Sequence, residues 1–387
     1  MQIDFHYYAT YAAAVLAGYS HEEAVDIAWS SQFVDCCSRS FLKTVDAPLS
    51  AATTQLQLEL MDTRTDLIGL QDITRIWASF HFLPYDLYAE VPRTSKAYRM
   101  KFRLLCDTNS DLLLETVELA RGGSLQAAGI AMHVLADTWA HRYFAGTPSL
   151  VINNTDFQFD ELLREGDTET ERRIRFNHNP ASPDDLENAL YTNSLYQGSE
   201  NSIMNLGHGR AGHLPDYGFL RYRYLPAWNG YKEVVKDNPS DYLHAFCQMI
   251  YALKYIRGEE STFEKGTYAF QAIEGLEEEI KEIIAQRRPL ASEGWKALGE
   301  KLSGREIPDF ETHACRDEYA AAEEQEKDGT FLGRFILAAL AQKSMVTNRI
   351  FISGNLLAGF SADYRKEGFR GIKDFIKLVE AKKEKRP

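Results

Sequence analysis

The 387-residue sequence contains no apolar run long enough to span a bilayer, and its first twenty residues lack the basic region of a signal peptide. Asp4 and His6 instead precede the first apolar stretch. The sequence therefore predicts a protein without a membrane span that stays in the cytoplasm.

Cysteine and positive charge are both scarce. The five cysteines form no CxxC pair, which is typical of reduced, buried thiols and argues against a thiolate zinc knuckle. The 43 Lys and Arg residues face 56 Asp and Glu residues, giving a formal net charge of −13. This balance disfavours binding to duplex DNA. Bound divalent cations would reverse the charge locally and admit a phosphate.

The most informative stretch is SLQAAGIAMHVLADTWAHRY at 124–143, which consists of good helix formers with few polar positions. It predicts a helix buried on most sides, with one polar stripe formed by His133, Asp137 and His141. Because four residues climb about 6 Å along a helix, His133 and His141 lie about 12 Å apart and cannot easily share an ion. The spacing favours two or three metal ions around Asp137, or else His–Asp hydrogen bonds within a core.

A second stretch, NLGHGRAGHLPDY at 205–217, contributes His208, His213 and Asp216 in a glycine-rich setting. Glycines let the backbone approach an ion or a phosphate closely, so this stretch predicts a second group of ligands on a loop. Arg210 lies within it and is a candidate phosphate contact, with ordinary surface exposure as the alternative.

Three further ligand-type residues come earlier in the chain. Asp35 ends an apolar, aromatic helix, and His81 stands just before Pro84, which disfavours a continued helix. His6 lies among tyrosines. Taken singly, Asp35 also fits a hydrogen-bonded helix cap, and each histidine fits a structural role in a core.

Helical patterns dominate the remaining sequence. They cover 5–17, 20–37 with a capping box at Ser20 and Glu23, 108–121, and several segments from 239 to about 350. Residues 145–182 indicate a long irregular excursion with one short helix near 159–164. The pattern predicts an all-α fold, a multi-helix bundle with long loops and at most a short hairpin. A helical core with the metal site would span 1–235, and a helical C-terminal part at 236–387 would pack on it as one globule.

The order of the candidate ligands resembles that of the zinc-dependent phospholipase C and single-strand-specific nuclease superfamily, which comprises all-helical enzymes with a three-zinc cluster. That order is His6, Asp35, His81, His133, Asp137, His141, His208 or His213, and Asp216. The boxes DFHYYATYAAAVLAGYS and GHGRAGHLPDY also look like an uncharacterised bacterial branch related to this superfamily. The match covers roughly residues 1 to 220, in isolated boxes.

The resemblance implies how the ligands divide among the ions. One zinc would be held by Asp35, His81, His133 and Asp137. A second would be held by His141, Asp216 and either His208 or His213. His6 and Asp137 would hold a third. Secreted relatives complete this third site with the amine and carbonyl of a mature N-terminal tryptophan, whereas Met1 stands first here, with Asp4 or a water as the substitute. The same ligand types also suit manganese or iron.

The implied function is a metal-dependent hydrolase that cleaves phosphodiester bonds of nucleotides or single-stranded nucleic acid, with Asp137 and Arg210 as catalytic candidates. One alternative is a phospholipase C-like lipid hydrolase, which the lack of an evident amphipathic or basic surface helix disfavours. The other is a non-catalytic helical sensor or scaffold with a residual structural metal site and a protein partner for its C-terminal helices.

Overall fold

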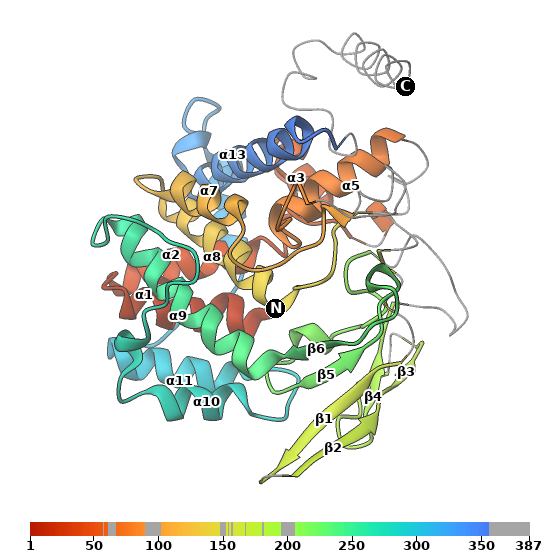
Figure 1. The fold of residues 1–387 in the computed structure, drawn as a ribbon. Helices are drawn as coiled ribbons and strands as arrows, with labels where there is room; N and C mark the ends of the chain where they lie inside the picture. The colour runs from red at the N-terminus through yellow and green to blue at the C-terminus, as the bar shows by residue number, and fades with distance from the viewer. Residues whose placement is uncertain are drawn as a thin grey trace.

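Helices form the greater part of the molecule in the computed structural model, and a small sheet lies at one side (Figure 1). The structure describes residues 1–56, 58–60, 67–89, 102–147, 152–153, 155, 158–166, 168–179, 182–194 and 206–355. The final 32 residues of the expected C-terminal part, 356–387, therefore lie outside the described residues.

The chain begins with a π-helix, η1 (Asp4–Ala9), which runs directly into α1 (Thr10–Leu16). In α2 (His21–Phe33), the Ser20 side chain accepts from the Glu23 amide while the Glu23 carboxylate accepts from the Ser20 amide, so the predicted capping box is confirmed. The following elements are α3 (Arg39–Thr44), η2 (Leu49–Ala51), α5 (Leu67–Phe80) and α7 (Asp111–Ala120).

Helix α8 (Leu125–Ala140) lies at the centre of the molecule, with its N-cap at Ser124 and its C-cap at His141. Every residue from Ala128 to Ala140 is buried, as the apolar sequence predicts. A Cβ atom at Gly129 would lie 2.4 Å from the carbonyl oxygen of Ile27, so only glycine lets α2 approach α8 this closely. This close approach brings the backbone of α2 within reach of the polar stripe on α8.

The expected all-α fold is wrong, because residues 160–237 form strands. Four of them make an antiparallel sheet in the order β2-β1-β5-β6, and two make a parallel pair, β3 with β4. Their bounds are β1 (Asp160–Glu165), β2 (Thr168–Arg173), β3 (Arg175–Asn177), β4 (Leu190–Thr192), β5 (Arg221–Tyr224) and β6 (Val234–Asp237). The short helix expected near 159–164 is strand β1 instead.

The charged residues in these strands suggested a loop from the sequence, but they form the solvent-facing side of the sheet. Tyr222 and Tyr224 of β5 are buried, whereas Arg223 between them pairs with Asp160 on β1 and with Glu171 on β2. Such period-two alternation with cross-strand ion pairs stabilises a half-buried sheet. The fold is therefore mixed α and β. Two short 3-10 turns, η3 (Leu214–Asp216) and η4 (Ala227–Asn229), flank β5.

The rest of the described chain is helical and packs against the N-terminal helices. It comprises α9 (Asn238–Arg257), η5 (Phe270–Ile273), α10 (Glu277–Ile284), α11 (Ser292–Ser303), α12 (His313–Ala321), η6 (Lys327–Gly329) and α13 (Phe331–Ile352). One apolar core contains residues from both parts, from Phe5 and Ile27 to Trp295 and Ile350. A smaller core lies beneath the sheet and includes Phe82. Among the described helices, none combines the length and apolar character needed to cross a membrane.

Candidate metal centre

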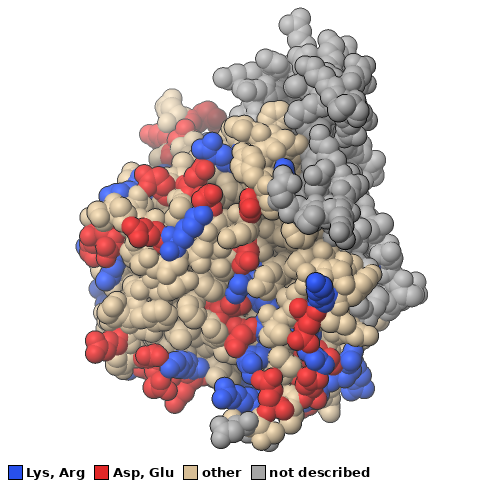
Figure 2. Space-filling view, in the orientation of Figure 1, with Lys and Arg blue, Asp and Glu red and all other residues tan. Residues whose placement is uncertain are grey.

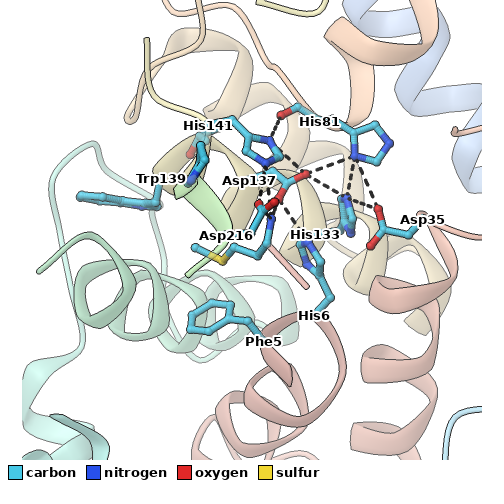
Figure 3. A network of polar contacts seen from close by, with 12 residues as sticks. Phe5, His6, Asp35, His81, His133, Asp137, Trp139, His141 and Asp216 are labelled. Carbon is cyan, nitrogen blue, oxygen red and sulfur yellow. Dashed lines mark hydrogen bonds and ion pairs between the residues drawn. The ribbon is translucent and has the colours of Figure 1, made fainter. Parts of the chain in front are cut away.

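The predicted ligands converge on one cavity at the C-terminal half of α8 (Figure 3). They come from η1, the end of α2, the end of α5, α8 itself, and the loop that leads into η3. Three groups have ligand atoms that lie within 4.8 Å of one another. The first is Asp35, His81 and His133, which Asp137 adjoins; the second is His141, His208 and Asp216; and the third is His6, His133 and Asp137. Sequence positions up to 210 residues apart are thus brought to one place.

The first group has the dimensions of a tetrahedral site. Asp137 Oδ2 lies 3.2 Å from both His81 Nδ1 and His133 Nε2, and these two nitrogens are themselves 3.2 Å apart. Asp35 Oδ1 stands 3.8 Å from His81 Nδ1 and 3.9 Å from His133 Nε2. Donor atoms bound at 2.0–2.1 Å to a tetrahedral zinc lie about 3.3 Å apart. These four residues therefore fit one ion.

Backbone carbonyls fix the orientation of the histidines. His133 Nδ1 donates to the carbonyl of Ser31 at 2.9 Å, and His81 Nε2 donates to the carbonyl of Thr53 at 3.0 Å. The proton of each neutral ring then lies on the outer nitrogen, and the inner nitrogen directs a lone pair at the site. Outer-nitrogen contacts of this kind are the usual support of metal-binding histidines.

Burial lowers the pKa of His133 to about 4, so at neutral pH its inner nitrogen carries no proton. This nitrogen and Asp137 Oδ2, both acceptors, then face each other at 3.2 Å without a proton between them, and His81 Nδ1 lies 3.2 Å from each. Such an arrangement is repulsive unless a cation lies at its centre.

The second group lies where α8 ends. His141 Nδ1 donates to the carbonyl of His81 at 2.7 Å, and His141 Nε2 is 3.3 Å from Asp216 Oδ1. His208 Nδ1 donates to the carbonyl of Gly212 at 2.7 Å, which leaves Nε2 at 3.7 Å from Asp216 Oδ2. Burial lowers the pKa of His208 to about 4. This ring therefore has the same arrangement as the histidines of the first group.

His213 differs from His208. Its side chain is 56% exposed, and its Nδ1 lies 3.2 Å from Asp216 Oδ2 rather than from a backbone carbonyl. The sequence left the choice between the two histidines open, and the geometry favours His208 as the ligand. His213 orients the Asp216 carboxylate and lines the mouth of the cavity.

The third group involves His6 and the N-terminal amine. His6 Nε2 lies 3.2 Å from Asp137 Oδ1, and its ring stacks on His133 with centroids 3.8 Å apart. The Met1 amine lies 2.8 Å from Asp137 Oδ1 and 3.2 Å from Asp216 Oδ1. Asp4, the expected substitute at this ion, points elsewhere, because its carboxylate accepts from the amides of Phe5 and Ala291.

The two central carboxylates are negatively charged despite their burial. Burial disfavours their charge, but His141 and the Met1 amine outweigh this effect at Asp137 and hold its pKa well below the usual range. At Asp216 the Met1 amine and His208 have the same effect on the pKa. These carboxylates in turn raise the pKa of the Met1 amine, against the effect of burial, to about 11. Negative charge is thus concentrated where cations would bind.

The cavity has a volume of about 380 Å³, and its lining includes Ile3, Thr54, Trp77 and the half-exposed His213. Its other lining residues include Phe82, whose ring stacks on His141. Arg210, the predicted phosphate contact, is only 4% exposed and is not among the lining residues. Among the described residues that line the cavity there is no Lys or Arg.

Sequence reasoning missed the groups that orient the ligands. Neither Gly129 nor the carbonyls of Ser31, Thr53 and Gly212 were expected to matter. A glycine inside a strongly helical pattern is the one signal that indicates a close helix contact. Backbone carbonyls leave no mark in a sequence.

Comparisons with known proteins add one finding. A family model described as a family of unknown function (DUF6765) matches residues 1–350, which includes every residue of the candidate centre. No curated protein and no solved structure matches the chain.

Proposed function

The chain belongs to DUF6765, a family of unknown function, and we propose that its site makes it a metal-dependent hydrolase of phosphodiester bonds. The observation that carries this proposal is the meeting of the inner nitrogens of His81 and His133 with the Asp137 carboxylate, at distances that suit a tetrahedral ion. The imidazole and carboxylate donors suit zinc and also manganese or iron, and zinc is the ion that the resemblance implies. The division that the resemblance to the zinc-dependent phospholipase C and single-strand-specific nuclease superfamily implies is similar to these groups, which differ from it by placing His133 beside His6 and Asp137 as well.

The residues would share the ions as follows. His81, His133, Asp35 and Asp137 hold one ion, and His141, His208 and Asp216 hold a second. Asp137 contributes its Oδ2 to the first ion and presents its Oδ1 toward His6 and the Met1 amine, so a third ion would share this carboxylate. Ions held in this way lower the pKa of bound water and polarise phosphate oxygens.

The lining of the cavity supports a substrate with one phosphodiester and a flat ring, such as a nucleotide or a short single strand. Trp77 provides an aromatic side chain beside the histidines, and aromatic side chains stack on bases irrespective of sequence. The ions supply the positive charge that the lining itself lacks. On the face drawn in Figure 2, basic side chains are interspersed with acidic ones, which does not favour duplex DNA.

Metal analysis combined with hydrolysis assays tests the proposal. We expect the purified protein to contain two or three zinc ions per chain and to hydrolyse bis(p-nitrophenyl) phosphate and a single-stranded oligonucleotide. A strong chelator should abolish both activities, and added zinc should restore them. A chain without divalent metal contradicts the proposal outright. Bound zinc without hydrolysis of any phosphodiester would favour a structural metal in a sensor or scaffold, and release of a phosphorylated headgroup from lipid vesicles would favour a lipid hydrolase.

A further inference from the structure

Asp4 connects the first turn of the chain to a helix almost three hundred residues later. Its Oδ2 accepts a hydrogen bond from the Ala291 amide at 2.9 Å, and its Oδ1 accepts one from the Phe5 amide at 2.9 Å. The side chain is 8% exposed. A carboxylate buried in this way is costly unless it is hydrogen-bonded, so both amide contacts matter for its position.

The partner of Asp4 is the start of α11. Ala291 is the N-cap residue of this helix, and no side-chain hydrogen bond caps it. Helix N-termini favour negative charge because their first amides lack intrahelical acceptors. Asp4 therefore supplies to α11 an acceptor that the helix itself does not have. The adjacent Phe5 packs against Tyr242 and Trp295, with ring centroids 4.9 and 5.6 Å away, and holds the same turn against α9 and α11.

His6 follows directly on this turn and differs from the other candidate histidines. His81, His133, His141 and His208 each donate one ring nitrogen to a backbone carbonyl. The Nδ1 of His6 is buried and has no hydrogen-bond partner. No backbone carbonyl therefore orients this ring, which stacks on His133, contacts Asp137 and is borne by the π-helix η1. π-Helical turns are rare and occur frequently at functional sites.

We propose that Asp4 is a positioning residue for the metal ion that His6 and Asp137 share, and that α11 acts on the site through it. The Asp4–Ala291 hydrogen bond fixes the η1 backbone, and η1 in turn aims His6 at Asp137 Oδ1, which lies 3.2 Å from its Nε2. The inference rests on the proposed function, because it needs an ion at this place. It gives the C-terminal helices, which contribute none of the ligands in the three groups, a role in the centre.

Asp4→Asn tests this role because it keeps the shape of the side chain and removes one of its two acceptor oxygens. We expect the variant to bind one zinc ion fewer than the wild type, or to bind its weakest ion at least tenfold less tightly. The matched control is Leu298→Ala, which removes a fully buried side chain from the same helix without touching Asp4. It should unfold at a lower temperature than the wild type and bind the same number of ions.

A double variant separates positioning from general stability. Because Asp4 is inferred to act through His6, adding Asp4→Asn to His6→Ala should cause no further loss of zinc, although the protein becomes less stable. A purely structural role would lower the unfolding temperatures of the metal-free and zinc-loaded proteins equally. The positioning role instead reduces the rise in unfolding temperature that zinc produces.

Hydrogen exchange in the wild-type protein tests the same link without a variant. If the Asp4–Ala291 contact supports the ion, then the ion must in turn stabilise the contact. Zinc added to the metal-free protein should slow amide exchange severalfold in residues 286–296. Unchanged exchange there, or an Asp4→Asn variant with wild-type zinc content and affinity, would overturn the inference. Absence of zinc from the wild-type protein would instead overturn the proposed function itself.

Discussion

The two main ligand groups differ in the structure that carries them. Asp35, His81 and His133 stand on or next to helices, and both histidines are nearly or fully buried, with exposures of 4% and 0%. His208 and Asp216 stand instead on a loop and a single 3-10 turn, beside a half-exposed His213. The distances between ligand atoms do not separate the two groups: in the first, three are 3.2 Å and those to Asp35 are 3.8 and 3.9 Å, and in the second His141 and His208 lie 3.3 and 3.7 Å from Asp216.

This difference indicates that the two groups have different roles in the site. The helix-borne group is fixed from several sides, as rigid secondary structure allows. The loop-borne group adjoins the mouth of the cavity, where a substrate must enter and leave. The first group therefore resembles a structural metal site in its rigidity, and the second resembles a site that adapts to what it binds.

Removal of Asp137, which the first and third groups share, should have the largest effect. Asp137→Ala removes the carboxylate that His81 and His133 share. It also leaves Asp216 as the one carboxylate paired with the Met1 amine among the described residues. A bound metal stabilises the transition state by several kcal/mol, and losing this contribution lowers the rate of hydrolysis by about a thousandfold or more. Rates and zinc content should be measured together with circular dichroism. A folded, zinc-loaded and active variant would contradict both groups at once.

Two substitutions in the loop-borne group should have unequal effects. His208→Ala removes a ligand, so one zinc should bind on the order of a hundredfold more weakly, whereas His213→Ala removes only an orienting partner of Asp216 and should cost about tenfold. Zinc titration with a competing chelator measures both values. Equal losses, or a larger loss for His213→Ala, would reverse the assignment of the ligand.

A change at the helix contact should weaken the helix-borne group alone. Gly129→Ala places a methyl group against Ile27 and Ser30, which should cost about 1–3 kcal/mol of stability and draw the Ser31 carbonyl away from His133. Gly329→Ala is the control, because a Cβ atom there meets no atom within 4 Å. The measurements are thermal unfolding and zinc content. An unfolding temperature equal to that of the control would show that α2 tolerates the shift.

The acid response of the metal-free protein should show the smallest effect. His133 and His208 have a folded-state pKa of about 4 against an ordinary value of 6.5, so the unfolded chain takes up protons first as the pH falls. Stability should therefore decline from about pH 6.5 towards pH 4. The hydrogen bond to Asp216 raises the pKa of His213 in the folded state. The stability that protonated His213 contributes is therefore lost as the pH rises through this raised pKa.

Unfolding curves between about pH 4 and 8 distinguish the two contributions. His133→Gln should flatten the acid side of the profile, and His213→Ala should flatten the side towards higher pH. Parallel profiles for the wild type and both variants would show that these rings do not titrate on unfolding as their burial implies.

The sequence was sufficient to predict which histidines and aspartates come together, but not the sheet. Helix α8 and its polar stripe follow from residues 124–143 alone, because helical periodicity is a local property. Strands β1 and β2 depend on ion pairs such as Arg172 with Glu161, whose partners are found only after the chain folds back. For the same reason the composition of 145–182 suggested a loop.

Within the site, the candidate ligands could be named from the sequence, and their geometry could not. The choice between His208 and His213 depends on which ring reaches a backbone carbonyl, and the sequence spacing is compatible with both. The burial of Arg210 was equally hidden, because its glycine-rich surroundings suggest an exposed loop. Side-chain direction in irregular segments is set by long-range packing rather than by local periodicity.

His81 contacts both ligand groups with different parts of the same residue. Its ring faces Asp137 and His133, while its carbonyl oxygen accepts the proton of His141 and so aims that second histidine. An ion that fixes the position of the His81 ring would also fix its carbonyl oxygen, and this would orient His141 for the neighbouring ion. The metals should consequently load cooperatively, and a chain that holds a single ion should be a minor species at every zinc concentration.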